Sequence, residues 1–180
     1  MNSNNLVWID LEMTGLNPNF HKIIEIAIIV TDIHLNILSI GPCIAINQSK
    51  KTIHFMNSWN RITHKKTGLL DKVKTSSYNE KKAEKEIILF LKKWIPRNSS
   101  PLCGNSINKD RQFLLKYMKR LELYFHYRSI DVSTIKELIK RWNPYLKLFK
   151  KQSIHNAKND LLESIKELKY YKKNFFINFC

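Results

Sequence analysis

Two acidic residues, Asp10 and Glu12, stand two positions apart where an apolar stretch ends. If that stretch is a strand, both side chains point to the same side of the sheet, because successive residues of a strand alternate between its faces. Two carboxylates on one side repel each other unless a cation lies between them, and hard oxygen ligands of this kind bind Mg²⁺ or Mn²⁺. The pair alone is weak evidence of a metal site, since solvated acidic pairs are common at strand ends.

Two further aspartates and a histidine extend this set. Asp110 follows a glycine-containing turn between an apolar run and a helical pattern, and Asp160 begins the last helical pattern, five residues after His155. A two-metal phosphodiesterase requires such groups, because oxygens hold the cations and a base removes a proton from water. Taken singly, each residue has a more ordinary explanation: the aspartates would complement helix dipoles, and His155 would be an exposed loop residue.

Hydrophobic periodicity predicts the elements that must position these groups. Runs rich in β-branched residues and separated by turn residues indicate strands, at residues 6–10, 22–31 and 35–46, with an interruption at Gly41 and Pro42. Apolar residues at helical spacing indicate helices, at residues 79–95, 111–123, 132–142 and 158–173, and residues 101–104 read as a short buried strand. Strands followed by helices interleaved with one or two more strands predict an α/β sandwich over a mixed sheet.

Length and composition predict a single domain over residues 1–180. A chain of this size buries roughly 70% of the surface that it exposes when unfolded. Hydrophobic residues make up 43% of the sequence and charged residues 26%, which is typical of a folded protein and not of a disordered one. We find no repeat, low-complexity block or long linker that would divide the chain.

The formal net charge is +16, from 31 basic and 15 acidic residues. Such an excess attracts polyanions, including nucleic acid. Lys supplies most of it, however, and Lys, Ile and Asn are all abundant, which is also the profile of A+T-rich coding. Both origins of the charge remain open.

The cysteines and the N-terminal segment predict a reducing, cytoplasmic location. Cys43, Cys103 and Cys180 are odd in number, far apart and free of any C-x-x-C spacing. The apolar run near the N-terminus meets Asp10 too soon to be a signal-peptide core. The longest uninterrupted apolar stretch, residues 26–30, is far shorter than the ~20 residues that span a bilayer, so no membrane association is expected.

Four segments resemble, in order and spacing, the motifs of the oligoribonuclease family of DEDDh 3′-to-5′ exonucleases. The first is WIDLEMTGLNP from Trp8 to Pro18, followed by IIEIA from Ile23 to Ala27. The others are CGNSINKDRQFLLKYM from Cys103 to Met118, YFHYRSIDVSTIKEL from Tyr124 to Leu138 and HNAKND from His155 to Asp160. The resemblance extends from Leu6 to about Phe175.

The resemblance implies an RNase H-like exonuclease fold of the α/β class, with a five-stranded mixed sheet flanked by helices. It also implies two divalent metal ions, Mg²⁺ or Mn²⁺, held by four carboxylates. His155 would be the general base, since an unperturbed histidine has a pKa of ~6.5 and is neutral at cytosolic pH. The four carboxylates would be those of Asp10, Glu12, Asp110 and Asp160.

The same resemblance assigns substrate contacts. Leu16 and Trp59 would provide apolar and aromatic surfaces for the bases, and the alternative for Trp59 is packing in the core. Ser106, Arg128 and Ser133 would receive the 5′ phosphate of a very short substrate, since a guanidinium binds phosphate through two hydrogen bonds.

The expected activity is 3′-to-5′ exoribonuclease activity on short single-stranded RNA, dinucleotides included, with release of 5′ mononucleotides. A related exonuclease that acts on longer RNA or DNA is the nearest alternative. The phosphate-binding cluster around Arg128 argues against this alternative, because residues that enclose the 5′ phosphate would leave no room for a longer chain. An alternative function without catalysis is that of a basic RNA-binding module. Such a module would have no physical need for four carboxylates and a histidine.

A row of aromatic residues from Tyr124 to Tyr127 precedes Arg128. Such a row fits a subunit interface, and the alternative is burial in the chain's own core. The resemblance implies a two-fold homodimer in which Tyr127 reaches into the partner's active site, and no other protein partner is expected. Two segments carry no functional assignment: residues 143–153 are richer in Lys and apolar residues than the family resemblance leads us to expect, and residues 175–180 lie beyond its motifs.

Overall fold

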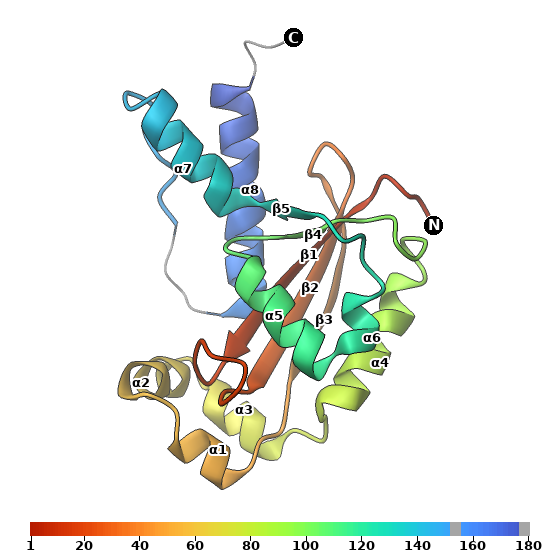
Figure 1. Cartoon of the computed structure of the whole chain (residues 1–180), viewed down its shortest axis with the longest axis vertical. Helices are drawn as coiled ribbons and strands as arrows, with labels where there is room; N and C mark the ends of the chain where they lie inside the picture. Colours follow the sequence, from red (N-terminus) through yellow and green to blue (C-terminus); the bar gives the residue numbers. More distant parts are fainter. Residues whose placement is uncertain (152–155, 177–180) are drawn as a thin grey trace.

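A five-stranded mixed sheet lies at the centre of the fold, with its strands in the order β3-β2-β1-β4-β5 (Figure 1). The computed structural model describes residues 1–151 and 156–176. The antiparallel strands are β1 (Leu6–Met13), β2 (Ile23–Thr31) and β3 (Ile37–Ala45). β4 (Leu102–Gly104) pairs in parallel with β1, and β5 (Ser129–Asp131) in parallel with β4. The mixed five-stranded sheet expected from the sequence is confirmed.

Successive side chains of β1 point to opposite faces of the sheet and so belong to two different layers of the core. Ile9 and Leu11 belong to the hydrophobic cluster on one face of the sheet, and Trp8 belongs to the cluster on the other face. Asp10 and Glu12 are in phase with Trp8, so their carboxylates leave the sheet on the Trp8 side.

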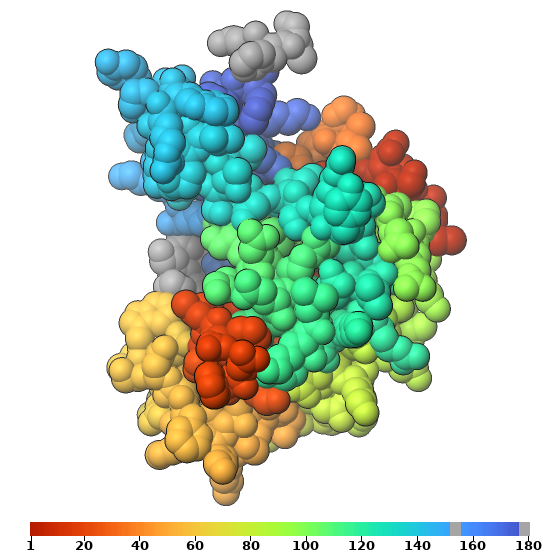
Figure 2. Space-filling view, in the orientation of Figure 1, coloured from red at the N-terminus to blue at the C-terminus, as the bar shows by residue number. Residues whose placement is uncertain are grey.

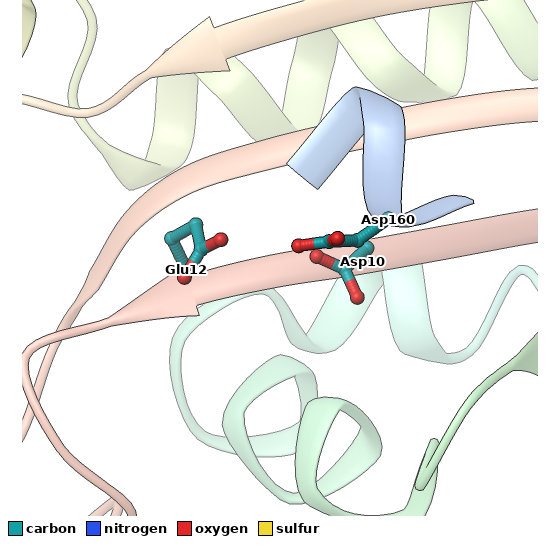
Figure 3. A group of neighbouring side chains, drawn as sticks. All are labelled: Asp10, Glu12 and Asp160. Atoms are coloured by element: carbon teal, nitrogen blue, oxygen red, sulfur yellow. The ribbon is translucent and has the colours of Figure 1, made fainter. Parts of the chain in front are cut away.

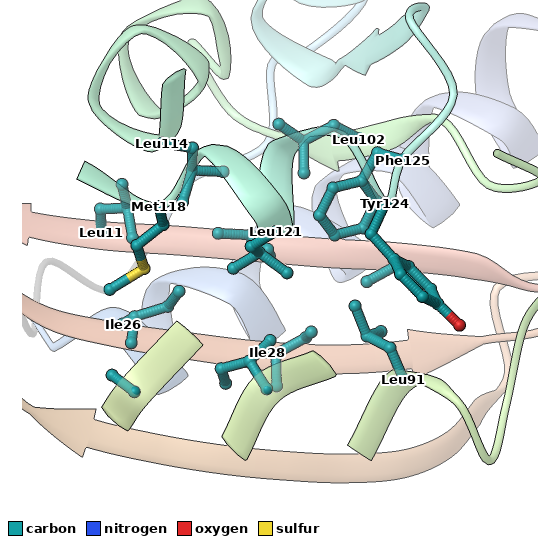
Figure 4. Close-up of a cluster of buried hydrophobic side chains, with 14 of the residues drawn as sticks. Leu11, Ile26, Ile28, Leu91, Leu102, Leu114, Met118, Leu121, Tyr124 and Phe125 are labelled. Atoms are coloured by element: carbon teal, nitrogen blue, oxygen red, sulfur yellow. The ribbon is translucent and has the colours of Figure 1, made fainter. Parts of the chain in front are cut away.

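Helices cover both faces of the sheet. The Ile9 side is covered by α4 (Glu80–Leu91), α5 (Asn108–Tyr117) and α6 (Lys119–Glu122), whose buried side chains meet those of the strands in Figure 4. The Trp8 side is covered by α7 (Val132–Trp142) and α8 (Ala157–Phe175). Leu146, Leu148 and Phe149, in the segment that precedes His155, also pack on this second cluster.

Three short helices lie between β3 and α4 in the sequence. These are α1 (Lys50–His54), α2 (Ser58–Lys66) and α3 (Leu69–Thr75). Leu69, Leu70 and Val73 of α3 form a small separate hydrophobic cluster with Ile24 of β2 and with Met56, which lies between α1 and α2. Figure 2 shows the three helices, in orange and yellow, next to the red loop that follows β1. In the part of the chain that the structure describes, no helix has both the length and the apolar character needed to cross a bilayer.

Two of the elements expected from the sequence differ in the structure, and α1, α2, α3 and β5 were not among the expected elements. The single helix expected over residues 111–123 is two helices, because Met118 leaves helical geometry (φ −139°, ψ 54°) and buries its side chain completely between α5 and α6. The interruption expected at Gly41 and Pro42 is an irregularity of pairing rather than a break in the strand, since β3 continues through both residues while its register with β2 shifts there. Proline is tolerated there because β3 is an edge strand.

Candidate active site

Three carboxylates from two segments that are distant in sequence meet at one side of β1. Asp10 and Glu12 come from β1 itself, and Asp160 comes from the first turn of α8 (Figure 3). One oxygen from each lies within 4.8 Å of the others. α8 contacts both β1 and β2, so the relative position of these groups depends on how α8 sits on the sheet.

The pKa values of these carboxylates show the cost of bringing them together. Burial, followed by the charges of Asp110, Glu12 and Asp160, raises the pKa of Asp10 well above its usual range. Burial and the charge of Asp160 raise the pKa of Glu12 from 4.5 to about 8. A divalent cation would remove this repulsion, and the donor set consists of hard oxygens, so the residues present fit Mg²⁺ or Mn²⁺.

Asp110 lies beside this group without belonging to it. Its side chain is 6% exposed, in the first turn of α5, and burial raises its pKa to about 7. Its Oδ1 accepts a hydrogen bond of 3.0 Å from the backbone N–H of Leu11, between Asp10 and Glu12. Asp110 therefore ties α5 to β1 and contributes to the charge around Asp10.

The predicted base, His155, lies outside the described residues, and its role stays a prediction. The residue that follows it, Asn156, is the N-cap of α8 and accepts a hydrogen bond from the N–H of Asn159. The backbone N–H of Asp160 donates to the carbonyl of Asn156 at 2.9 Å, which forms the first hydrogen bond of the helix.

Leu16 and Trp59 line one hollow of about 190 Å³ together with Glu12 and His64. Their side chains are 67% and 61% exposed, so the alternative that Trp59 packs in the core is wrong. The hollow shares Glu12 with the carboxylate group, and an apolar surface suited to a nucleobase therefore adjoins the candidate metal site.

The predicted phosphate-binding residues are brought together only in part. The backbone N–H groups of Ser106 and Ser133 both donate to Oδ1 of Asp131, each at 2.9 Å, and the hydroxyl of Ser133 donates to the same oxygen at 2.7 Å. Arg128 precedes the first residue of β5, whereas Asp131 is the last residue of that strand. The guanidinium of Arg128 lies 5.6 Å from the centre of the Tyr127 ring.

The aromatic row at residues 124–127 divides between core and surface. Tyr124 and Phe125 are buried in the chain's own core, and the hydroxyl of Tyr124 donates to the carbonyl of Ile95 at 3.0 Å. Tyr127 is 73% exposed. The interpretation of the row as an interface surface is wrong for Tyr124 and Phe125. Tyr127 and Arg128 are both exposed to solvent.

Two buried residues next to Glu12 had no assigned role in the sequence analysis. His64 on α2 is 3% exposed, and its Nε2 lies 3.9 Å from Oε2 of Glu12. Glu25 on β2 is 2% exposed and pairs directly with Glu12 across the strands. Glu25 could have been noticed in the sequence, because it is a carboxylate inside an otherwise apolar strand. His64 could not, because α2 was not predicted.

Comparison with known proteins identifies full-length relatives. The model of the exonuclease family RNase_T matches residues 7–168. The chain is 59% identical over 176 residues to an oligoribonuclease of Buchnera aphidicola subsp. Schizaphis graminum, covering 98% of this chain and 95% of that protein. It is 54% identical over 176 residues to an oligoribonuclease of Pectobacterium atrosepticum, covering 97% of this chain and 98% of that protein.

A solved structure shows the same fold. Exonuclease I of Escherichia coli, in a zinc-bound complex with single-stranded DNA, matches 99% of this chain with a TM-score of 0.76. The two sequences are 14% identical and the chain spans 42% of that protein, so this likeness bears on the fold alone. It confirms the RNase H-like exonuclease fold expected from the sequence.

Proposed function

Because the chain belongs to the exonuclease family and, within it, to the oligoribonucleases, we propose that it hydrolyses short oligoribonucleotides, dinucleotides included, from the 3′ end to 5′ mononucleotides. Family membership makes it a hydrolytic exoribonuclease. The observation that carries the reaction is the meeting of Asp10, Glu12 and Asp160 within 4.8 Å, because ionised carboxylates so placed repel each other unless a cation lies between them.

Four residues would hold two divalent cations, Mg²⁺ or Mn²⁺: Asp10, Glu12, Asp110 and Asp160. When bound, the cations activate water and stabilise the charge that develops on the leaving 3′ oxygen. Asp110 differs from the other three because it already accepts a hydrogen bond from Leu11.

The remaining residues handle the proton and the nucleoside. His155 takes the proton of the attacking water through a neutral imidazole nitrogen. Leu16 and Trp59 hold the 3′ base without reading its identity, since every base offers a π-face for stacking. Both line the hollow that includes Glu12, so a base held there keeps its own phosphodiester near the carboxylates.

Substrate length would be limited at the other end of the site. Ser106 and Ser133 meet around Asp131. The hydroxyl of Ser106 would donate to a 5′ phosphate, whereas the single O–H of Ser133 donates to Asp131 and would have to turn from it to do the same. The Asp131 carboxylate would repel that phosphate, so a cation must accompany the pair, and Arg128 is the predicted residue. A substrate whose 5′ end is held in this way cannot extend further.

The separation of Arg128 from Ser106 and Ser133 supports a shared site. Arg128 lies over the exposed ring of Tyr127, so the two side chains can enter a neighbouring subunit together. We propose a two-fold homodimer in which Tyr127 contacts the substrate of the partner, accompanied by Arg128.

The test is cleavage of 5′-phosphorylated RNAs of two to ten nucleotides by the purified protein with Mg²⁺. We expect kcat/KM to be highest for the shortest RNAs, and Arg128→Ala to reduce cleavage of dinucleotides most. Equal kcat/KM at all lengths would favour a second function, that of an exonuclease for longer strands. The net charge of +16 supports that function, because a longer nucleic acid offers more phosphates to basic residues.

A further inference from the structure

The loop between β1 and β2 carries Leu16, the residue proposed to contact the 3′ base. Leu16 is 67% exposed, so burial of its own side chain does not hold it in place. A loop that becomes ordered only when substrate binds loses conformational entropy at that step, and this loss weakens binding. The contacts that hold the loop before substrate arrives therefore bear on how well Leu16 can receive a base.

Hydrogen bonds within the loop close it into a compact turn. The backbone N–H of Thr14 donates to the carbonyl of Lys22, and the N–H of Lys22 donates to the hydroxyl oxygen of Thr14, each at 3.0 Å. Nearer the tip, the N–H groups of Phe20 and His21 both donate to the carbonyl of Asn17. These bonds give the loop its shape, and its position relative to the rest of the site depends on contacts from outside.

The end of α5 provides such contacts. Tyr117 is the last residue of α5, and its hydroxyl oxygen lies 2.6 Å from the carbonyl oxygen of Pro18 and 2.8 Å from that of His21. A hydroxyl has one hydrogen, so the two carbonyls share it. The neighbouring Lys116 donates from Nζ to Oδ1 of Asn19 at 2.8 Å. Figure 2 shows the loop, in red, against the green surface of α5.

The ring of Tyr117 is held as well as its hydroxyl. It is half-buried against the core cluster under α4, α5 and α6, and its centre lies 6.1 Å from that of the Phe113 ring. Nζ of Lys22, at the base of the loop, lies 4.4 Å from the centre of the Tyr117 ring, which is a cation–π contact. The bond between Leu11 and Asp110 ties the other end of α5 to β1. Tyr117 therefore joins the loop to a helix that is itself bonded to the strand of the carboxylates.

We propose that Tyr117 is a positioning residue that holds the loop between β1 and β2 through its hydroxyl and thereby presents Leu16 to the 3′ base of the substrate. The proposal rests on the proposed function in one respect, namely that Leu16 contacts a base. It deepens that function because it gives a role in substrate binding to the end of α5 opposite to the one that carries Asp110.

Tyr117→Phe removes the hydroxyl and keeps the ring, so it separates the hydrogen bonds from the packing. The net contribution of a hydrogen bond corresponds to a factor of about 3 to 10, so KM for a 5′-phosphorylated RNA dinucleotide should rise by that factor. kcat should stay within about twofold, because a base contact that is equal in the ground state and the transition state affects KM alone. The N–H groups of Phe20 and His21 should exchange with solvent at least about threefold faster by NMR, because the loop that they close is held less firmly.

Tyr124→Phe is the matched control. Tyr124 also donates from its hydroxyl to a backbone carbonyl, that of Ile95 at 3.0 Å, within the buried core. The loss of this hydroxyl should lower the melting temperature without changing KM for the dinucleotide. An equal rise of KM in Tyr124→Phe and Tyr117→Phe would reflect a general loss of stability and would overturn the proposal.

Leu16→Ala tests whether Tyr117 acts through Leu16. Added to Leu16→Ala, Tyr117→Phe should change KM by less than about twofold, because no base contact is left to position. Effects on KM that multiply in the double variant would overturn the proposal, as would a wild-type KM in Tyr117→Phe when Leu16→Ala raises KM. Unchanged exchange of Phe20 and His21 in Tyr117→Phe would overturn it whatever the effect of Leu16→Ala, whereas a wild-type KM in Leu16→Ala would contradict the proposed contact of Leu16 with a base.

Discussion

The backbone N–H of Leu11 donates a hydrogen bond of 3.0 Å to Oδ1 of Asp110. Leu11 lies between Asp10 and Glu12 on β1, so α5 is tied to the strand that carries two of the other carboxylates. Asp110 thus has a structural bond in addition to its proposed contact with the metal.

Two substitutions separate these contributions. Asp110→Asn keeps an acceptor for Leu11 but loses the charge, so turnover should fall by at least about 100-fold, or ~2.7 kcal/mol in activation free energy, with little change in stability. Asp110→Ala also leaves a buried N–H without a partner, so the free energy of unfolding should fall by about 1–3 kcal/mol. Urea unfolding and dinucleotide turnover measure both quantities, and wild-type turnover in Asp110→Asn would exclude a catalytic contribution of its charge.

The crowded carboxylates predict an unusual dependence of stability on pH. The pKa of Glu12 rises from 4.5 to about 8 on folding, and that of Asp110 rises to about 7. Between the unfolded and folded pKa values the native state binds more protons than the unfolded state, so the free energy of unfolding falls as pH rises from about 4.5 to about 8. Urea unfolding in EDTA from pH 5 to pH 8 should show this fall, and Mg²⁺ should reduce it. A stability that rises over this range in EDTA, and does so equally in Glu12→Gln, would refute the prediction.

Trp59→Ala should lower kcat/KM and leave the fold intact. A stacked base contributes about 1–3 kcal/mol, so kcat/KM should fall by about 5- to 150-fold. The side chain is 61% exposed, so the melting temperature should hardly change. Trp142 on α7 is a matched control, since it is 66% exposed and outside the hollow. A similar loss of kcat/KM in Trp142→Ala would remove the specific role from Trp59.

Subunit mixing tests the shared site. Tyr127→Ala and Asp10→Ala should each be nearly inactive alone, and their mixture should regain activity, because one of the two sites in a heterodimer then has all its carboxylates and a tyrosine from the partner. Arg128→Ala mixed with Asp10→Ala should behave in the same way. The control is Asp10→Ala mixed with a chain that carries both substitutions, which restores no complete site. A monomer in sedimentation at micromolar concentration, or no rescue after verified exchange, would exclude the shared site.

The sequence predicted the parts of the site that depend on local geometry. Strand alternation places Asp10 and Glu12 on one face, and the spacing of the last motif places Asp160 at the start of a helix. Contacts between distant segments were not predictable in this way. The bond of Asp110 to Leu11 depends on how α5 packs on the sheet, and the meeting of Asp160 with Asp10 and Glu12 depends on how α8 packs on it.

The missed elements lack the patterns on which prediction depends. α1 and α2 are short and expose Phe55 and Ile62, so their apolar residues do not form one stripe. β5 has three residues and is recognisable only by its pairing with β4. Tyr124 and Tyr127 look alike in sequence, and the packing of the core alone decides that one is buried and the other exposed.

The most direct test of the proposed reaction is release of 5′ mononucleotide from a 5′-phosphorylated RNA dinucleotide by the wild type and by Asp160→Asn. We expect the wild type to be inactive in EDTA and active when Mg²⁺ or Mn²⁺ is restored, and Asp160→Asn to fold normally but retain less than about a hundredth of the rate. Wild-type cleavage that persists in EDTA, or a rate above about a tenth of wild type in Asp160→Asn, would contradict a metal-dependent site built on these carboxylates.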